Sequence, residues 1–159
     1  MSKIAPCLWF NGGAEEAAGF YVSLFPDARI TSVSRYGDNA PFPPGTALMV
    51  EFTLFNQRFQ ALNGHVDFPF SEAVSFSVEC EDQSEVDFYW EHLIQDGGAP
   101  SMCGWLKDRF GLSWQIVPKP FIRMMKEGTP DQCQRTMAAL MTMRKLDIAE
   151  LQKAFEGTP

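Results

Sequence analysis

The apolar and polar residues of the first 64 positions alternate between strand-like and helix-like patterns. The expected elements are a strand at 6–10, a helix ending at Phe25, and strands at 29–36, 47–54 and 59–62. Asn11 precedes two glycines and is a candidate N-cap for the helix. The last two strands predict a hairpin that turns through Asn56 and Gln57. The predicted order is therefore β-α-β-β-β.

The same order is predicted a second time in the next stretch of the chain. The expected elements are a strand at 73–80, a helix at 86–94, and strands at 99–102, 104–107 and 112–117. Asp82 or Ser84 can cap the helix, and Asp96 with the two glycines after it ends the helix. Two halves with one order of elements suggest an internal repeat.

The sequences of the two halves support a duplication. Residues 20–25 (FYVSLF) line up with residues 88–93 (FYWEHL), 68 positions further along. At the same spacing, the strand-like run 7–10 falls on 75–78. We therefore expect one α+β domain at 1–118, built from two βαβββ modules at about 4–64 and 72–118.

The residues beyond Pro118 predict helices. Thr129 is a candidate N-cap, with Pro130 at the first helical position and Gln132 completing a capping box. Asp147 can start another short helix, with Gly157 past its end. Residues 119–159 are therefore expected to form a C-terminal helical extension, whose methionines suit core or dimer packing.

Composition narrows the possible partners and the location. The net charge of −7 disfavours nucleic acid, because affinity for phosphates comes largely from Lys and Arg. It also disfavours anionic membranes, and no run approaches the roughly 20 apolar residues that span a bilayer. The four scattered cysteines form no Cys-x-x-Cys pair and are expected to be free thiols in a reducing compartment. We therefore expect a cytoplasmic protein.

Several motifs resemble the PhnB-like group of the vicinal oxygen chelate superfamily, which includes glyoxalase I, bleomycin-resistance proteins and extradiol dioxygenases. These motifs are LWFNG at 8–12, AEEA at 14–17, FYVSLF at 20–25, ALNG at 61–64, CGWLKD at 103–108 and FGLSWQ at 110–115. The resemblance implies a glyoxalase/bleomycin-resistance-like open sheet. It also implies a homodimer with a concave pocket for a small molecule.

Enzymes of that superfamily hold a divalent metal with His and Glu side chains on the concave sheet. Comparison with the family's positions places these ligands at Ala5, Ala73, Gln115 and one residue between Gln60 and Asn63. None of these is a histidine or a carboxylate, so we expect no metal and no other cofactor. The two histidines, His65 and His92, lie outside these positions, and no residue stands out as catalytic.

Strand alternation predicts which side chains face the pocket. If Ala5 faces inward, Leu8 and Phe10 pack against the helix, and Trp114 is core. The predicted ligand-binding residues are Cys7, Trp9, Ser75, Ser77 and Gln115, with Asn63 and Trp105 as further candidates. The tryptophans can instead simply fill the interior. Cys7 and Cys103 are expected to be buried, inert thiols, because no base lies near them.

Three functions remain open on the sequence. The leading hypothesis is a metal-independent small-molecule binding protein that works as a homodimer. The alternatives are a metal-dependent lyase, isomerase or dioxygenase of the same superfamily, and a structural or regulatory protein that uses its C-terminal helices as an interface. A methyl-donor site is disfavoured, since no glycine-rich turn of the nucleotide-binding kind is present.

Overall fold

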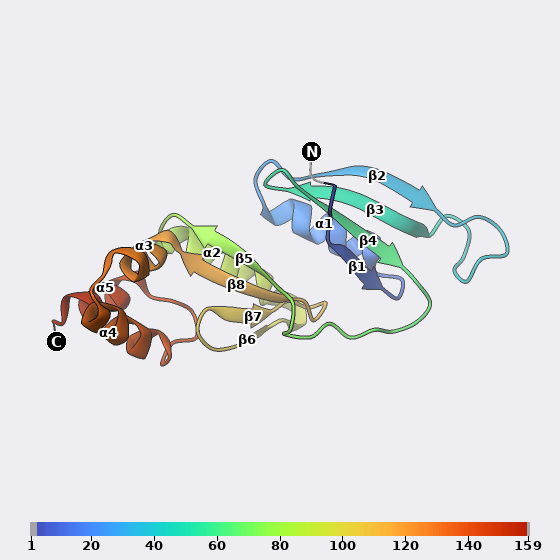
Figure 1. Cartoon of the computed structure of the whole chain (residues 1–159). Coiled ribbons are helices and arrows are strands. Elements are labelled where there is room, and N and C mark those ends of the chain that lie inside the picture. The colour runs from blue at the N-terminus through green and yellow to red at the C-terminus, as the bar shows by residue number, and fades with distance from the viewer. Residues whose placement is uncertain (1–2, 159) are drawn as a thin grey trace. The chain divides into compact units, whose positions relative to one another are not determined.

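A computed structural model describes residues 3–158 of the chain (Figure 1). It confirms the α+β fold, with two four-stranded sheets and C-terminal helices. The chain divides into two compact units, Met1–Pro69 and Phe70–Pro159. The first unit holds the first βαβββ module, hereafter module 1, and the second holds module 2 together with the C-terminal helices.

Module 1 is a four-stranded sheet with one helix. Its elements are β1 (Cys7–Phe10), α1 (Ala14–Leu24), β2 (Arg29–Arg35), β3 (Ala47–Leu54) and β4 (Gln57–Asn63). The strand order is β1-β4-β3-β2, with β1 parallel to β4 and the other pairs antiparallel. The buried residues Ala14, Ala17, Ala18 and Tyr21 belong to α1. We call the opposite side of the sheet, on which the strand residues stay partly exposed, its open face.

The start of α1 differs from the sequence prediction. Gly13 is the N-cap residue and makes no side-chain cap hydrogen bond, so the assignment of Asn11 as the cap was wrong. The amide of Asn63 supplies the cap instead: its Oδ1 accepts hydrogen bonds from the backbone N–H groups of Ala14 at 2.9 Å and Gly12 at 3.0 Å. The parallel pairing of β1 with β4 brings Asn63 beside this turn.

The hairpin between β3 and β4 turns one residue earlier than predicted. Phe55 and Asn56 have φ values of 46° and 61°, whereas Gln57 already pairs with Leu54 as the first residue of β4. Two successive positive φ values are typical of a two-residue type I′ turn. A phenylalanine rarely adopts this conformation, which is why the turn was misplaced.

Module 2 repeats the arrangement of module 1. Its elements are β5 (Ser75–Cys80), α2 (Gln83–Leu93), the 3₁₀ turn η1 (Gln95–Gly97), β6 (Ala99–Pro100), β7 (Trp105–Lys107) and β8 (Ser113–Pro118). The strand order is β5-β8-β7-β6, with β5 parallel to β8. Of the two predicted caps, Asp82 is the one used, and its side chain accepts a hydrogen bond from Glu85 N–H at 3.0 Å.

The C-terminal extension consists of α3 (Lys119–Glu127), α4 (Pro130–Leu140) and α5 (Ile148–Glu156). The predicted capping box at Thr129 and Gln132 is present, and Asp147 caps α5. The three helices share a buried cluster of Met124, Leu140, Leu146 and Leu151.

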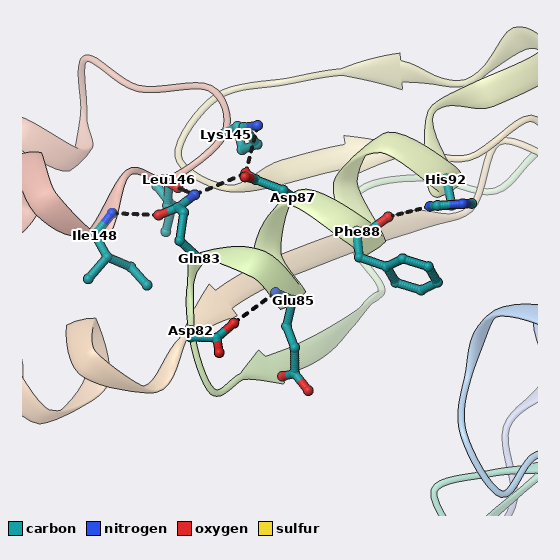
Figure 2. Close-up of polar contacts among 9 residues, drawn as sticks. All are labelled: Asp82, Gln83, Glu85, Asp87, Phe88, His92, Lys145, Leu146 and Ile148. Atoms are coloured by element: carbon teal, nitrogen blue, oxygen red, sulfur yellow. Dashed lines mark hydrogen bonds and ion pairs between the residues drawn. The ribbon is translucent and has the colours of Figure 1, made fainter.

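A second set of contacts joins the extension to module 2. The side chain of Gln83 donates to the carbonyl of Leu146 and accepts from the N–H of Ile148, as Figure 2 shows. The N–H groups of Cys103 and Gly104 donate to carbonyls of the segment between α4 and α5. The extension is thus anchored on both α2 and the β6–β7 connection.

Among residues 3–158, the structure contains no helix that is both long and apolar enough to cross a membrane.

Candidate functional site

The open face of module 2 gathers most of the predicted ligand-binding residues. Ser77 pairs with Gln115 across β5 and β8, and Gln115 pairs with Trp105 across β8 and β7, so the three form one row. The Gln115 amide donates to Ser75 Oγ at 2.9 Å. Ser77 is exposed, while Ser75, Trp105 and Gln115 are half-buried. The sheet register therefore brings four predicted residues together.

The open face of module 1 carries Cys7 and Trp9. Leu8 and Phe10, which alternate with them, are buried, as the period of a strand requires. The Trp9 indole N–H donates to the carbonyl of Val66 at 2.7 Å, and its ring meets Phe68 edge to face at 5.4 Å. Trp9 is thereby held by the segment that follows β4.

Asn63 does not share the open face with the other predicted residues. It is 1 % exposed and alternates with the half-buried Leu62. Its amide nitrogen donates to the carbonyl of Ala47 at 2.9 Å, and its oxygen caps α1. Both polar groups of this side chain thus stabilise the fold of module 1, and Asn63 is not part of the proposed binding site.

The cysteines differ from one another in environment. All four are free thiols, as predicted. Cys7 is exposed, so the expectation that it is buried was wrong: β1 is the outer strand of its sheet and Cys7 points to the open face. Partial burial nevertheless raises the pKa of the Cys7 thiol, which keeps it protonated and weakly nucleophilic. Cys103 is half-buried, with its Sγ 3.7 Å from Met141 Sδ.

Glu51 is a polar residue of the open face that the sequence analysis missed. It lies between Ser32 and Gln60 in the sheet register, and Gln60 in turn pairs with Cys7. Hydrogen bonds from the Ser32 hydroxyl and the Gln60 amide, with the Arg58 guanidinium beside them, hold the pKa of Glu51 below its usual value. The alternation of apolar and polar residues at 50–54 (VEFTL) is the sequence signal that predicts its position.

Asp108 is occupied by the fold. It is 2 % exposed, and one carboxylate oxygen accepts from the N–H groups of Phe110 and Leu112. The other oxygen accepts from the Trp114 indole N–H at 2.9 Å. This carboxylate therefore closes the turn between β7 and β8, which is the structural role that aspartate often has in turns.

The residues at the superfamily's metal-ligand positions do not fit a metal. Ser77 and Trp9 are equivalent in the repeat, and they pair with Gln115 and Leu62 respectively. The module 1 counterpart of Gln115 is therefore Leu62, which has no ligand atom. Among residues 3–158, no group of three His, Cys, Asp or Glu side chains could hold a metal ion.

The two histidines lie outside the strands of both modules. His65 is exposed in the segment after β4, and His92 is half-buried near the end of α2. The Nδ1 atom of His92 lies 2.7 Å from the carbonyl oxygen of Phe88, within the same helix (Figure 2). Neither histidine shares a strand with the predicted ligand-binding residues.

Comparison with known proteins agrees with the duplicated fold. The family model described as 3-demethylubiquinone-9 3-methyltransferase matches residues 2–117. The PhnB protein from Bacillus cereus is 40 % identical over 74 % of this chain and 99 % of its own, with a TM-score of 0.69. This chain belongs to the PhnB-like family.

More distant structures share the fold of this PhnB-like chain. A protein from Pseudomonas aeruginosa is 21 % identical over 74 % of this chain and 98 % of its own, with a TM-score of 0.61. The fosfomycin resistance protein FosX from Listeria monocytogenes is 11 % identical over 74 % of this chain and 93 % of its own, with a TM-score of 0.52. The search of curated proteins gave no match. The family match ends at residue 117, before α3 begins.

Proposed function

We propose that this PhnB-like protein binds a small organic molecule on the open face of its sheets, as a cytoplasmic homodimer and without a resident metal ion. The observation that carries the proposal is the row of Ser77, Gln115 and Trp105 on module 2. An aromatic surface beside a few hydrogen-bonding groups is the usual composition of a small-molecule site. The homodimer is motivated by the superfamily resemblance.

The chemistry of the open face supports a binding function without metal. Gln115 and its counterpart Leu62 replace the carboxylates that a divalent ion would need. The amide of Gln115 donates to Ser75 and leaves its own carbonyl oxygen available as an acceptor. The face is therefore suited to directional hydrogen bonds with an organic ligand.

The turn before α1 does not support a methyl-donor site of the nucleotide-binding kind. The glycine-containing turn here joins β1 to α1 within a βαβββ module, and its N–H groups at Gly12 and Ala14 bond to Asn63. The proposal therefore does not include the methyltransferase activity in the description of the family.

The first experiment measures metal content. The untagged protein is reconstituted with Mg, Mn, Fe, Ni or Zn and dialysed, and its bound metal is measured by plasma mass spectrometry. The molar mass of the protein in solution is measured in parallel and gives its oligomeric state. We expect a dimer that retains no stoichiometric metal. One tightly held ion per chain would overturn the metal-free proposal and restore metal chemistry of the superfamily kind.

The second experiment measures ligand binding. A fragment library is screened in EDTA by ¹H–¹⁵N NMR, and we expect chemical-shift changes at the open-face residues of β5, β7 and β8. Gln115→Leu introduces the residue found at the equivalent position of module 1, Leu62. This variant should bind the fragments several-fold more weakly than the wild type. The exposed Gln95 offers a matched control, Gln95→Leu, that should not. A library that shifts no open-face residue would contradict the proposal.

A further inference from the structure

A hollow between β5 and α3 adjoins the open face of module 2. It has a volume of about 410 Å³ and is lined by Glu79, Glu81, Lys119, Ile122, Arg123 and Lys126. This volume lies within the roughly 300–1,000 Å³ of small-molecule sites. Glu79 is exposed and alternates with the buried Val78 and Cys80, so it belongs to the open face, as Ser77 does. The hollow therefore continues the face on which binding is proposed.

Lys119 compensates the carboxylates of the hollow. Its ammonium group forms an ion pair with Glu81, at the point where α3 lies beside the end of β5 (Figure 1). The hydrogen bond with Glu81 and the negative charge of Glu79 raise the pKa of Lys119. This lysine is therefore engaged by the acidic side chains at the end of β5.

Arg123 and Lys126 are the positive charges that remain. Both are exposed, and among residues 3–158 neither forms an ion pair. They lie three positions apart on α3 and are neighbours on one side of the helix, where two like charges repel each other. An anion bound between them would remove this repulsion. Both lie beyond residue 117, where the family match ends.

The charges that line the hollow define the charge of the ligand. Three positive and two negative side chains leave an excess of one positive charge. A ligand with one negative charge balances this excess, whereas a phosphate monoester carries more negative charge than the hollow can compensate. The guanidinium group of Arg123 offers a fork of N–H donors that matches the two oxygens of a carboxylate. A carboxylate is therefore the anion that fits.

We infer that the hollow binds the carboxylate of a singly charged organic acid, with Arg123 and Lys126 as the residues that recognise it. The remainder of the acid lies along the open face toward Ser77 and Gln115. Glu79 and Ser77 are two positions apart on β5, or about 7 Å, so one ring with a short chain spans the distance. The inference rests on the proposed function, because the ligand occupies the same face, and it adds the class of the ligand.

The experiment compares four probes that differ in their charged or polar group. Binding of 3-(4-fluorophenyl)propanoate, its amide, 3-(4-fluorophenyl)propylamine and 2-(4-fluorophenyl)ethyl phosphate to the full chain is measured by ¹⁹F NMR. We expect the propanoate to bind about tenfold tighter than its amide, because charge-assisted hydrogen bonds are stronger than neutral ones. It should also bind more tightly than the phosphate. Equal affinity for the propanoate and its amide, or a preference for the amine or the phosphate, would overturn the assignment of a carboxylate.

Two variants test the residues that recognise the carboxylate. Arg123→Gln and Lys126→Gln should each weaken propanoate binding several-fold and leave binding of the amide unchanged, and the double variant should bind both probes equally. Because both side chains are exposed, the thermal unfolding midpoint should stay the same. A preference for the propanoate that persists in the double variant would refute the inference.

Arg144→Gln is the matched control. It removes one positive charge from an exposed position of the same extension, outside the hollow, and should leave the preference for the propanoate intact. Glu79→Gln provides the opposite case, since it removes a negative charge from the hollow and should strengthen propanoate binding roughly twofold. Loss of the preference in Arg144→Gln, or weaker binding in Glu79→Gln, would count against the hollow as the site.

Chemical shifts of the ¹⁵N-labelled chain separate this inference from the proposed function. If screened fragments shift Ser77 and Gln115 but the propanoate shifts no residue of α3, the proposed function stands and this inference fails. If neither the fragments nor the propanoate shift Ser77 or Gln115, the proposed function fails, and the inference, which places the ligand on the same face, fails with it.

Discussion

The side-chain oxygen of Asn63 accepts a hydrogen bond of 2.9 Å from the backbone N–H of Ala14, 49 residues earlier in the sequence. The end of β4 thereby caps the start of α1, and the same oxygen also binds the N–H of Gly12. The amide nitrogen completes the arrangement on the carbonyl of Ala47. One side chain therefore joins β3, β4 and the turn after β1.

Asn63→Ala should destabilise module 1 by about 2–3 kcal/mol. The substitution leaves buried N–H groups and a carbonyl without partners, and each such group costs about 1–3 kcal/mol. Asn11→Ala is the matched control, because Asn11 is exposed and does not cap the helix, and it should change stability by less than about 0.5 kcal/mol. Urea unfolding followed by circular dichroism measures both. Equal effects would mean that Asn63 is not the cap.

Gly64→Ala should displace the indole of Trp9. A Cβ at Gly64 would overlap the six-membered part of the Trp9 ring, which would have to leave Val66 and Phe68. Such overpacking costs about 1–3 kcal/mol. Near-UV circular dichroism and urea unfolding report the change.

Gly19→Ala provides the opposite case in the same module. Nothing lies within 4 Å of a Cβ at this helical position, so alanine should stabilise the chain by about 0.5–1 kcal/mol. If Gly64→Ala were as harmless as Gly19→Ala, the packing described for Trp9 would be wrong.

Gln83→Ala should loosen the C-terminal extension. The Gln83 amide bonds to Leu146 and Ile148, and these bonds span more than 60 residues of sequence (Figure 2). Their loss should cost about 1–3 kcal/mol and raise hydrogen exchange in α5. Glu91→Ala, at an exposed position of the same helix, should leave exchange in α5 unchanged. Unchanged exchange in the Gln83 variant would show that the extension is held by its apolar cluster alone.

Asp87 should contribute to the stability of the folded chain in a way that depends on pH in the acid range. Hydrogen bonds from Lys145 and Gln83 hold the pKa of Asp87 below the usual value for an aspartate. A lowered carboxyl pKa means that the stabilisation is present above the ordinary pKa and is lost as the pH falls through the lowered one. NMR titration of Asp87 should give a higher pKa in Lys145→Met than in wild type. An identical pKa would contradict the ion pair.

Cys80 should resist alkylation until the protein unfolds. Burial, together with the negative charges of Glu85 and Asp82, raises the pKa of this thiol to about 12. At pH 8, iodoacetamide should therefore modify the exposed Cys7 long before Cys80, as read by peptide mass spectrometry. Fast labelling of Cys80 in the folded chain would contradict its burial.

The same shift predicts a loss of stability in alkali. The unfolded chain releases the Cys80 proton near the ordinary pKa, whereas the folded chain holds it to about 12. The contribution of the protonated Cys80 thiol to stability is therefore complete below pH 9 and is lost as the pH rises from 9 to 12. Cys80→Ala should make stability depend less on pH in this range. Part of the dependence should remain, because burial also raises the pKa of Tyr89.

Local patterns were sufficient for the order of elements. Alternation and helical spacing located both βαβββ modules, and the caps at Asp82, Thr129 and Asp147 follow from residues within three positions of one another. The side of the sheet taken by Trp9, Ser77 and Gln115 was also predictable, because a strand alternates with a period of two. These features depend on neighbours in sequence.

The tertiary structure alone decided which distant residues meet. Asn63 rather than Asn11 caps α1 because the parallel pairing of β1 with β4 brings a residue 49 positions away to the helix start. In the same way, the register across β5, β8 and β7 places Ser77, Gln115 and Trp105 in one row, although they are distant in the sequence. Hydrogen bonds of this kind are set by strand order and register, and a linear pattern of residue types contains neither.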